Sequence, residues 1–130
     1  MTIIERTSKG RFASFVMDND HLPAAARYIE LNPVRAKIVR KAHRYPYSSA
    51  RSHVQGRADP LVCDSPLTRM VDDWAKFLSA GTNEEEQALF RRHASTGRPL
   101  GGKRFIAKLE KLLDRPLFPK KAGRPPKAKK

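Results

Sequence analysis

The chain is poor in the residues that form covalent cross-links and membrane spans. It contains a single cysteine, Cys63, which excludes an intrachain disulfide and a cysteine-rich zinc site. No apolar run approaches the ~20 residues that a membrane-spanning helix needs. The first residues, MTIIERTSKG, lack the apolar segment of a secretory signal. We therefore expect a cytoplasmic protein without a membrane partner.

Acidic residues are scarce relative to basic ones. The sequence has 13 Asp and Glu against 27 Lys and Arg, which gives a formal net charge of +14. This excess is larger than solubility requires and indicates a polyanionic partner. Nucleic acid is the first candidate. An anionic membrane surface is the weaker alternative, because the sequence shows no strongly amphipathic basic helix with a Trp-rich face.

The length and the hydrophobic pattern predict a mainly α fold. A chain of 130 residues, 39% of them apolar, is long enough for one domain with a modest core. Residues 11–17 carry apolar side chains on both alternating faces, which predicts a strand buried on two sides and lacking an obvious partner strand. Apolar spacing, caps and breakers predict helices over residues 20–31, 34–39, 49–55, 67–78, 83–94 and 103–113, with a serine cap on the third.

The last two predicted helices are compatible with a helix-turn-helix, although their joint is longer than usual. A plain hairpin of two helices explains the spacing at least equally well. The final helix should turn an apolar stripe inward, consisting of Phe105, Ile106, Leu109, Leu112 and Leu113.

The composition changes after Leu113 to Lys, Arg, Pro, Ala and Gly, which predicts that residues 114–130 form a disordered basic tail. The Gly-Arg-Pro sequence around Arg124 suits the minor groove of A·T-rich DNA. A generic polybasic arm is an equal alternative.

A tyrosine and an asparagine lie four residues apart in the segment RYIELNPVRA. On a helix Tyr28 and Asn32 would share one face, so a phenol and an amide oxygen could address the same ligand atom. Glu30 would point away from Tyr28. Pro33 should end or kink the helix at Asn32. From the spacing alone, a core tyrosine on an amphipathic helix is the first interpretation of Tyr28.

Several segments together resemble the C-terminal part of the REP-associated tyrosine transposases, which are single-tyrosine enzymes of the HUH type. The segments are GRFASFVMDNDHL, AARYIELNPVRAKIV, YPYSSARSH, WAKFLSAG, RRHASTGRPLGGKRFIAKLEKLL and KKAGRPPK, of which RYIELNPVRA and TGRPLGG are the most specific. The resemblance covers the chain from about Gly10 to the tail. It implies the helical C-terminal part of an α+β HUH-transposase fold, with one N-terminal strand remnant.

The resemblance implies tyrosine-mediated, metal-dependent cleavage and joining of DNA, with single-stranded or hairpin DNA as the partner. Tyr28 matches the nucleophile, and Asn32 matches a position that helps to hold a divalent metal, Mg²⁺ or Mn²⁺. A phenol with a pKa near ~10 is a weak nucleophile at neutral pH, so the reaction needs a metal that polarises the phosphate.

The chain departs from this family in its histidines. The family's metal-binding His-hydrophobe-His pair is absent from the sequence. The four histidines are isolated, and we interpret them as surface or capping residues: His21, His43, His53 and His93. The metal site should therefore be incomplete and bind metal poorly, and transposase activity should be absent from the isolated chain. Lys37 also stands where members of this family usually carry glycine. The chain therefore departs from the family at a position where glycine would permit a tight turn.

These observations predict four segments. Residues 1–56 would be the remnant of the catalytic domain, 57–66 a loop, 67–113 a helical and DNA-binding region, and 114–130 the basic tail. The predicted function is a DNA-binding protein of the transposase family. A non-catalytic DNA-binding protein and a decayed gene product remain as alternatives. The cations expected to grip DNA are Arg35, Arg40, Lys41, Arg98, Lys103, Arg104, Lys120, Lys121, Arg124 and Lys127.

Overall fold

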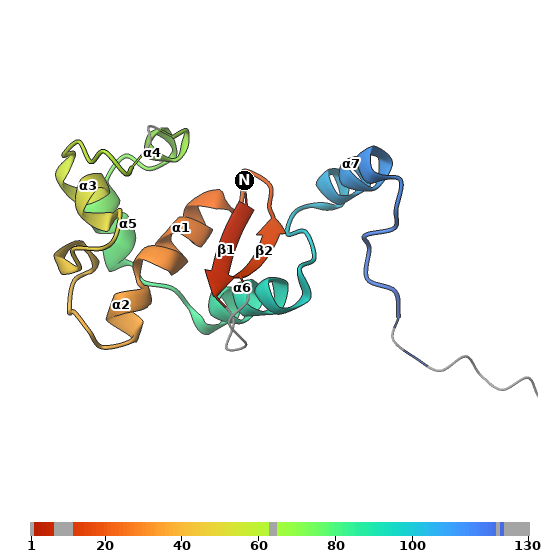
Figure 1. The fold of residues 1–130 in the computed structure, drawn as a ribbon, viewed down its shortest axis with the longest axis horizontal. Coiled ribbons are helices and arrows are strands. Elements are labelled where there is room, and N and C mark those ends of the chain that lie inside the picture. The colour runs from red at the N-terminus through yellow and green to blue at the C-terminus, as the bar shows by residue number, and fades with distance from the viewer. Residues whose placement is uncertain (1, 7–11, 63–64, 122, 124–130) are drawn as a thin grey trace, which may run out of the picture.

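Helices predominate in the structure, as the sequence predicted. The computed structural model describes residues 2–6, 12–62, 65–121 and 123. In order the elements are β1 (Thr2–Arg6), β2 (Phe12–Val16), α1 (Leu22–Glu30), α2 (Asn32–Arg35), the 3-10 helix η1 (Ala42–Arg44), α3 (Ala50–Gln55), α4 (Leu67–Met70), α5 (Trp74–Ser79), α6 (Glu84–Thr96) and α7 (Lys103–Leu113). Figure 1 shows α1 at the centre of the body, with α6 and the strands on one side and α2 to α5 on the other.

The strand predicted to lack a partner has one. Strand β1 pairs with β2 in an antiparallel hairpin, in a register that sets Thr2 opposite Val16 and Arg6 opposite Phe12. The prediction that β2 is buried on two sides is also wrong, because Phe15 is buried while Ser14 and Val16 are exposed. Strand β2 contacts α6, and Ser14 and Val16, which share one face of this strand, stay open to solvent.

The segment between α6 and α7 extends this hairpin. Leu100 pairs with Met17 in a parallel bridge. The Leu100 N–H donates to the Val16 carbonyl (2.8 Å), and the Asp18 N–H donates to the Leu100 carbonyl (3.0 Å). The TGRPLGG segment is therefore held against the end of β2 by backbone hydrogen bonds, and it separates α6 from α7.

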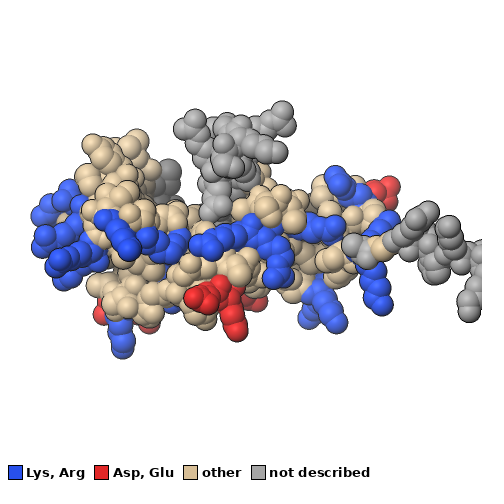
Figure 2. Space-filling model, turned by 90° about the horizontal axis from the view of Figure 1, so that it is seen from below, with Lys and Arg blue, Asp and Glu red and all other residues tan. Residues whose placement is uncertain are grey.

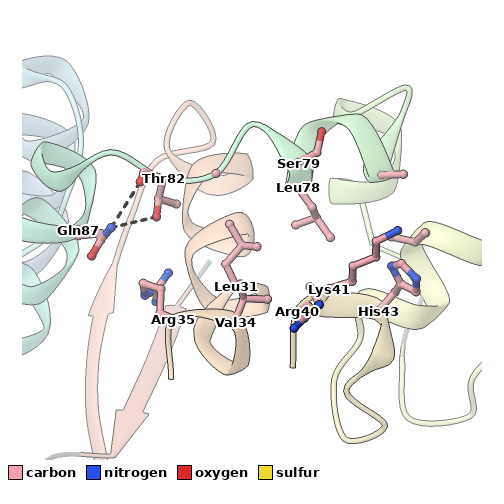
Figure 3. Close-up of a pocket in the computed structure, with 14 residues that line it drawn as sticks. Leu31, Val34, Arg35, Arg40, Lys41, His43, Leu78, Ser79, Thr82 and Gln87 are labelled. Carbon is pink, nitrogen blue, oxygen red and sulfur yellow. Dashed lines mark hydrogen bonds between the residues drawn. The ribbon is translucent and has the colours of Figure 1, made fainter. Parts of the chain in front are cut away.

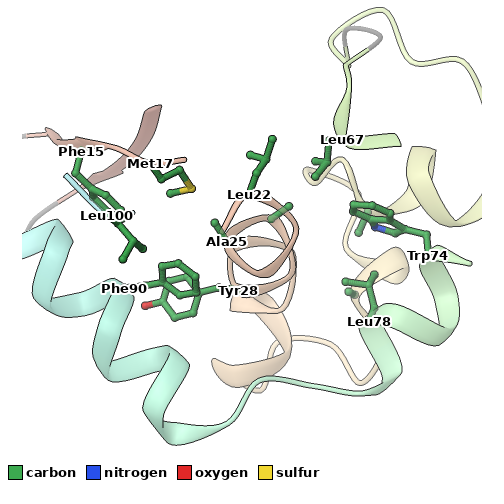
Figure 4. Packing of buried hydrophobic residues seen from close by; sticks show 13 residues of the cluster. Phe15, Met17, Leu22, Ala25, Tyr28, Leu67, Trp74, Leu78, Phe90 and Leu100 are labelled. Carbon is green, nitrogen blue, oxygen red and sulfur yellow. The ribbon is translucent and has the colours of Figure 1, made fainter. Parts of the chain in front are cut away.

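Helix α1 buries side chains in two directions. In Figure 4, which looks along α1, Tyr28 meets Phe90 of α6 on one side, while Leu67 and Trp74 lie on the other. Ala25 and Ala26 are both buried, and their small side chains allow neighbouring elements to approach closely. The buried cluster takes residues from the segments before residue 57 and after residue 66, so the predicted remnant and the predicted helical region share one core.

Two helix boundaries differ from prediction. The helix expected over residues 67–78 is broken into α4 and α5, because Val71 is extended and Asp73 begins a new helix by accepting a hydrogen bond from the Lys76 N–H (3.0 Å). The second helix spans Asn32–Arg35 and not residues 34–39. At the break between α4 and α5, the cap at Asp73 starts a new helix although the apolar side chains continue at helical spacing.

The predicted serine cap on α3 comes from Ser48 and not from the residue at the N-cap position. Ser49 occupies the cap position but makes no capping hydrogen bond with its side chain, which turns to Glu30. Ser48 instead accepts a hydrogen bond from the Ala50 N–H at 3.1 Å.

Helix α6 follows its sequence signals closely. Asn83 caps it by accepting from the Glu86 N–H (2.7 Å), and Gly97 ends it in the left-handed conformation, with φ +67°.

Helix α7 has the predicted bounds but not the predicted packing. Ile106 is buried, whereas Leu112 and Leu113 are 76% and 54% exposed, so the prediction of a fully inward stripe is wrong. Figure 1 shows α7 projecting from the body, away from α1. Periodicity places these leucines on one face of the helix but does not supply an element to cover that face.

The start of the predicted tail is attached to α7. The N–H groups of Phe118 and Leu117 donate to Oε1 of Glu110 and lower the pKa of this carboxyl. Lys120 and Lys121 follow as exposed residues outside helices and strands. Arg124 and Lys127 lie outside the described residues.

Candidate nucleic-acid interface

Tyr28, the predicted nucleophile, is part of the core. The residue is 5% exposed, and its ring packs on Phe90 with 5.1 Å between centroids. The guanidinium carbon of Arg35 lies 4.1 Å from the ring centroid. In this arrangement the tyrosine is covered by an aromatic ring from α6 and a cation from α2, which matches the interpretation as a core tyrosine.

Asn32 binds a side chain of its own segment. Nη2 of Arg35 donates both to the Tyr28 carbonyl (2.8 Å) and to Oδ1 of Asn32. The amide oxygen predicted to help hold a metal therefore accepts a hydrogen bond from a guanidinium. Helix α1 ends at Glu30, so Tyr28 and Asn32 belong to different helices and do not share one helix face.

The residues around Tyr28 do not fit the divalent metal that the resemblance implies. Mg²⁺ and Mn²⁺ prefer several oxygen ligands, and a fixed guanidinium beside Asn32 repels a second cation. Among the residues that the structure describes, no group of three or more His, Cys, Asp or Glu is placed to hold a metal ion.

Glu30 is a buried carboxylate that gathers three polar side chains around it. It is 3% exposed, and it points to Trp74 on the side of α1 opposite to Tyr28 and Phe90, as predicted. Ser49 Oγ donates to Oε1 (2.6 Å), Trp74 Nε1 donates to Oε2 (2.6 Å), and Nδ1 of His53 lies 2.5 Å from Oε1. The carboxylate thereby joins α1 to α3 and α5.

His53 is not a surface or capping residue, contrary to the prediction. Its side chain is 9% exposed and its ring packs against Trp74 at 4.6 Å. By contrast, His21 lies at the start of α1 with Nδ1 2.5 Å from Asp18, and His93 lies near the end of α6 with Nδ1 2.8 Å from the Arg98 carbonyl. His43 is half-buried in η1.

A second contact that the sequence did not reveal joins α1 to α6. Arg27 donates through Nη2 to both carboxylate oxygens of Glu86 (2.9 and 3.1 Å), and its guanidinium lies 4.6 Å from the ring centroid of Phe77. Neither partner was singled out from the sequence, because Glu86 is 59 residues away and only the fold brings it close.

The predicted DNA-binding cations are placed unevenly. Arg35 is half-buried on Tyr28, while Arg40 and Lys41 are exposed between α2 and η1. The remaining described members are also exposed, namely Arg98, Lys103, Arg104, Lys120 and Lys121. Figure 2 shows Lys and Arg side chains spread along the length of one face, with a smaller acidic group near its middle. A long basic face of this kind suits an extended polyanion.

Asp18 orders the segment that carries Arg98 and Lys103. Its Oδ2 accepts from the Gly102 N–H (3.0 Å), and its Oδ1 accepts from the His21 N–H (3.2 Å). Burial alone would raise the pKa of this carboxyl, but the hydrogen bonds from His21 and Gly102 together lower it below its ordinary value.

Searches of protein-family models, curated proteins and solved structures found no match to this chain. The resemblance to the REP-associated tyrosine transposases therefore stays a prediction from the sequence. No helix in the described part of the chain is long and apolar enough to cross a bilayer.

Proposed function

We propose that this chain is a DNA-binding protein that grips the phosphate backbone through its basic face. The observation that carries this proposal is the combination of a net charge of +14 with exposed cations along the length of one face (Figure 2). Arg40, Lys41, Arg98, Lys103 and Arg104 are the exposed contacts from the folded body. Phosphate contacts of this kind supply affinity without requiring a base sequence.

The test is a salt titration of DNA affinity. Fluorescence anisotropy with a labelled hairpin should give a log Kd that rises linearly with log salt, by roughly 0.7 to 0.9 for each phosphate neutralised. Replacing Arg98, Lys103 and Arg104 together by Gln should lower both the affinity and this slope. The matched control replaces three exposed acids, Glu84, Glu85 and Asp72, by their amides, which should not weaken binding. Affinity that does not change with salt would rule out backbone-dominated binding.

We further propose that the chain is related to the REP-associated tyrosine transposases but does not carry out their reaction by itself. The burial of Tyr28 under Phe90 and Arg35 supports this, because a nucleophile must reach the phosphorus atom. So does the hydrogen bond from Arg35 to Asn32, which competes with a metal for the amide oxygen.

A covalent-adduct assay tests this second proposal. Labelled hairpin DNA incubated with the protein and Mg²⁺ or Mn²⁺ should give no band of a covalent protein–DNA adduct on a denaturing gel. The control variant is Tyr28→Phe, which keeps the ring contacts with Phe90 and removes the hydroxyl. A slow-migrating band that appears with the wild-type chain and disappears in Tyr28→Phe would overturn the proposal.

A further inference from the structure

A cavity of about 480 Å³ opens between α2, η1, α5 and the segment that leads into α6. Part of its wall is apolar, and Figure 3 shows Leu31 and Val34 on one side with Leu78 opposite them. This volume lies within the range of about 300 to 1,000 Å³ that small-molecule sites occupy. No part of the sequence argument predicted this cavity.

The rim of the cavity is basic. Arg40, Lys41 and His43 gather on one side of the space between the apolar walls (Figure 3). Of the described residues that line the cavity, none is acidic. Arg40 and Lys41 are exposed, and they are also among the cations proposed to hold the DNA backbone.

The other side of the cavity offers neutral hydrogen-bonding groups. Thr82 and Gln87 lie across from Arg40, Lys41 and His43 in Figure 3, on the same side as Arg35. The amide nitrogen of Gln87 donates to Thr82 at 3.3 and 3.4 Å, and its Oε1 accepts from Arg91 at 3.4 Å. All three hydrogen bonds are long, so the amide can turn to a ligand at small cost. A fitting ligand thus has an anionic end, a flat or apolar middle and a polar edge.

We propose that this cavity receives one unpaired nucleotide of bound DNA, with its phosphate at Arg40 and Lys41 and its base between Leu31 and Leu78. This inference rests on the proposed DNA-binding function and adds a ligand site to it. A base in a duplex is stacked and paired, so it enters a cavity only where the strand is single or the nucleotide is extruded. The site therefore favours DNA with an unpaired nucleotide over a perfect duplex.

The first test uses mononucleotides on the full chain. Two-dimensional NMR at constant ionic strength should show saturable shifts of the Ala42, Gly81 and Thr82 amides with deoxynucleoside 5′-monophosphates. Sodium phosphate and the free deoxynucleosides should each give weaker shifts. Equal shifts with phosphate alone would reduce the site to an anion site and overturn the proposal, as would no shift with any nucleotide.

The second test fills the cavity. Ala75 lines it and is exposed on α5, so Ala75→Phe adds volume without replacing a core residue. A duplex with one bulged nucleotide should bind the variant about tenfold more weakly, which corresponds to about 1.4 kcal/mol of binding free energy. Binding of the perfect duplex should not change. The matched control is Ala88→Phe on the exposed side of α6, which should bind both DNAs normally.

The outcomes separate this inference from the proposed function. If Ala75→Phe binds the bulged duplex with unchanged affinity and normal salt dependence, the cavity proposal is wrong. The proposal of phosphate-backbone binding is not affected by this result. Saturable mononucleotide binding without any DNA binding would contradict the proposed function and support the nucleotide site in the cavity.

If Ala75→Phe does not fold, the pair Arg40→Gln and Lys41→Gln replaces it in the mononucleotide titration. Its control is Lys108→Gln with Lys111→Gln on α7, which removes the same charge far from the cavity.

Discussion

Glu30 gathers hydrogen-bond donors from two separate helical segments on one buried carboxylate. Because it joins α1 to Ser49, His53 and Trp74, it stabilises the arrangement of three elements at once. A buried charge is stabilising only when its partners are complete, and removal of one charge leaves the other groups unsatisfied.

We expect Glu30→Gln to lower the free energy of unfolding by about 2 to 4 kcal/mol. The substituted amide can accept on one side but presents an N–H toward a donor on the other. Urea denaturation followed by circular dichroism measures the decrease. Glu85→Gln, exposed on α6, is the matched control and should change stability by less than about 0.5 kcal/mol. Equal stability of the two variants would show that the cluster contributes little.

Lys37 is a residue at which the backbone conformation is strained. Its φ is +59°, in the left-handed region that glycine occupies without steric cost. The transposase family that the sequence resembles usually carries glycine at this position. Its side chain is exposed.

Lys37→Gly should therefore raise the free energy of unfolding by up to about 1 kcal/mol, since relief of the Cβ clash exceeds the added backbone entropy of the unfolded chain. Thermal unfolding detects this gain as a higher Tm. Ala36→Gly is the control at a neighbouring residue with φ −75°, and it should lower the Tm. A lower Tm for Lys37→Gly would contradict the left-handed assignment.

At the scale of elements, the TGRPLGG segment depends on close approach. A Cβ on Gly101 would overlap Phe105 Cδ1 and lie 2.8 Å from Asp18 Oδ2, whereas a Cβ on Gly102 would meet no atom within 4 Å. Close packing therefore requires a glycine at position 101 but not at position 102, although the two are neighbours in sequence.

We expect Gly101→Ala to destabilise the protein by about 1 to 3 kcal/mol, because Phe105 and the Asp18 carboxylate must both move. Gly102→Ala should cost clearly less. Chemical denaturation of the two variants side by side gives the comparison. Similar destabilisation in both would mean that the segment tolerates a shift.

Asp18 makes the same segment sensitive to acid. Its pKa is lowered in the folded protein, so its contribution to stability is present above the ordinary aspartate pKa of about 4 and is lost as the pH falls through the folded-state value. Asp18→Asn should destabilise the protein at pH 7. It should also lose less stability than the wild type between pH 5 and pH 3, as measured by urea midpoints at each pH. Parallel decreases in the two proteins would contradict this assignment.

On the scale of the whole molecule, the charge is divided between the folded body and the residues beyond Phe118. Residues 119–130 carry six Lys and Arg, including Lys120, Lys121, Arg124 and Lys127. Counterion release makes each phosphate contact visible in the salt dependence of binding.

Removal of residues 119–130 should reduce the slope of log Kd against log salt by roughly 0.7 to 0.9 for each phosphate that these residues neutralise, while leaving the thermal stability unchanged. The Leu117 and Phe118 hydrogen bonds with Glu110 are kept in this variant. A full-length variant with the same six cations replaced by Gln separates charge from length. An unchanged slope in both would assign all phosphate binding to the folded body.

Features that local interactions control follow from the amino-acid sequence alone. The cap at Asn83, the left-handed glycine at Gly97 and the bounds of α7 depend on hydrogen bonds and periodicity within a few residues. The excess of cations needed no structure at all.

Which surfaces meet became evident only in the folded chain. The partners of Glu30 lie 19, 23 and 44 residues away, and periodicity fixes which helix face a residue occupies but not what covers it. For the same reason Leu112 stayed exposed where burial was predicted, and Tyr28 met Phe90 and Arg35 in the core. The cavity beside Arg40 and Lys41 likewise exists because segments distant in sequence enclose it.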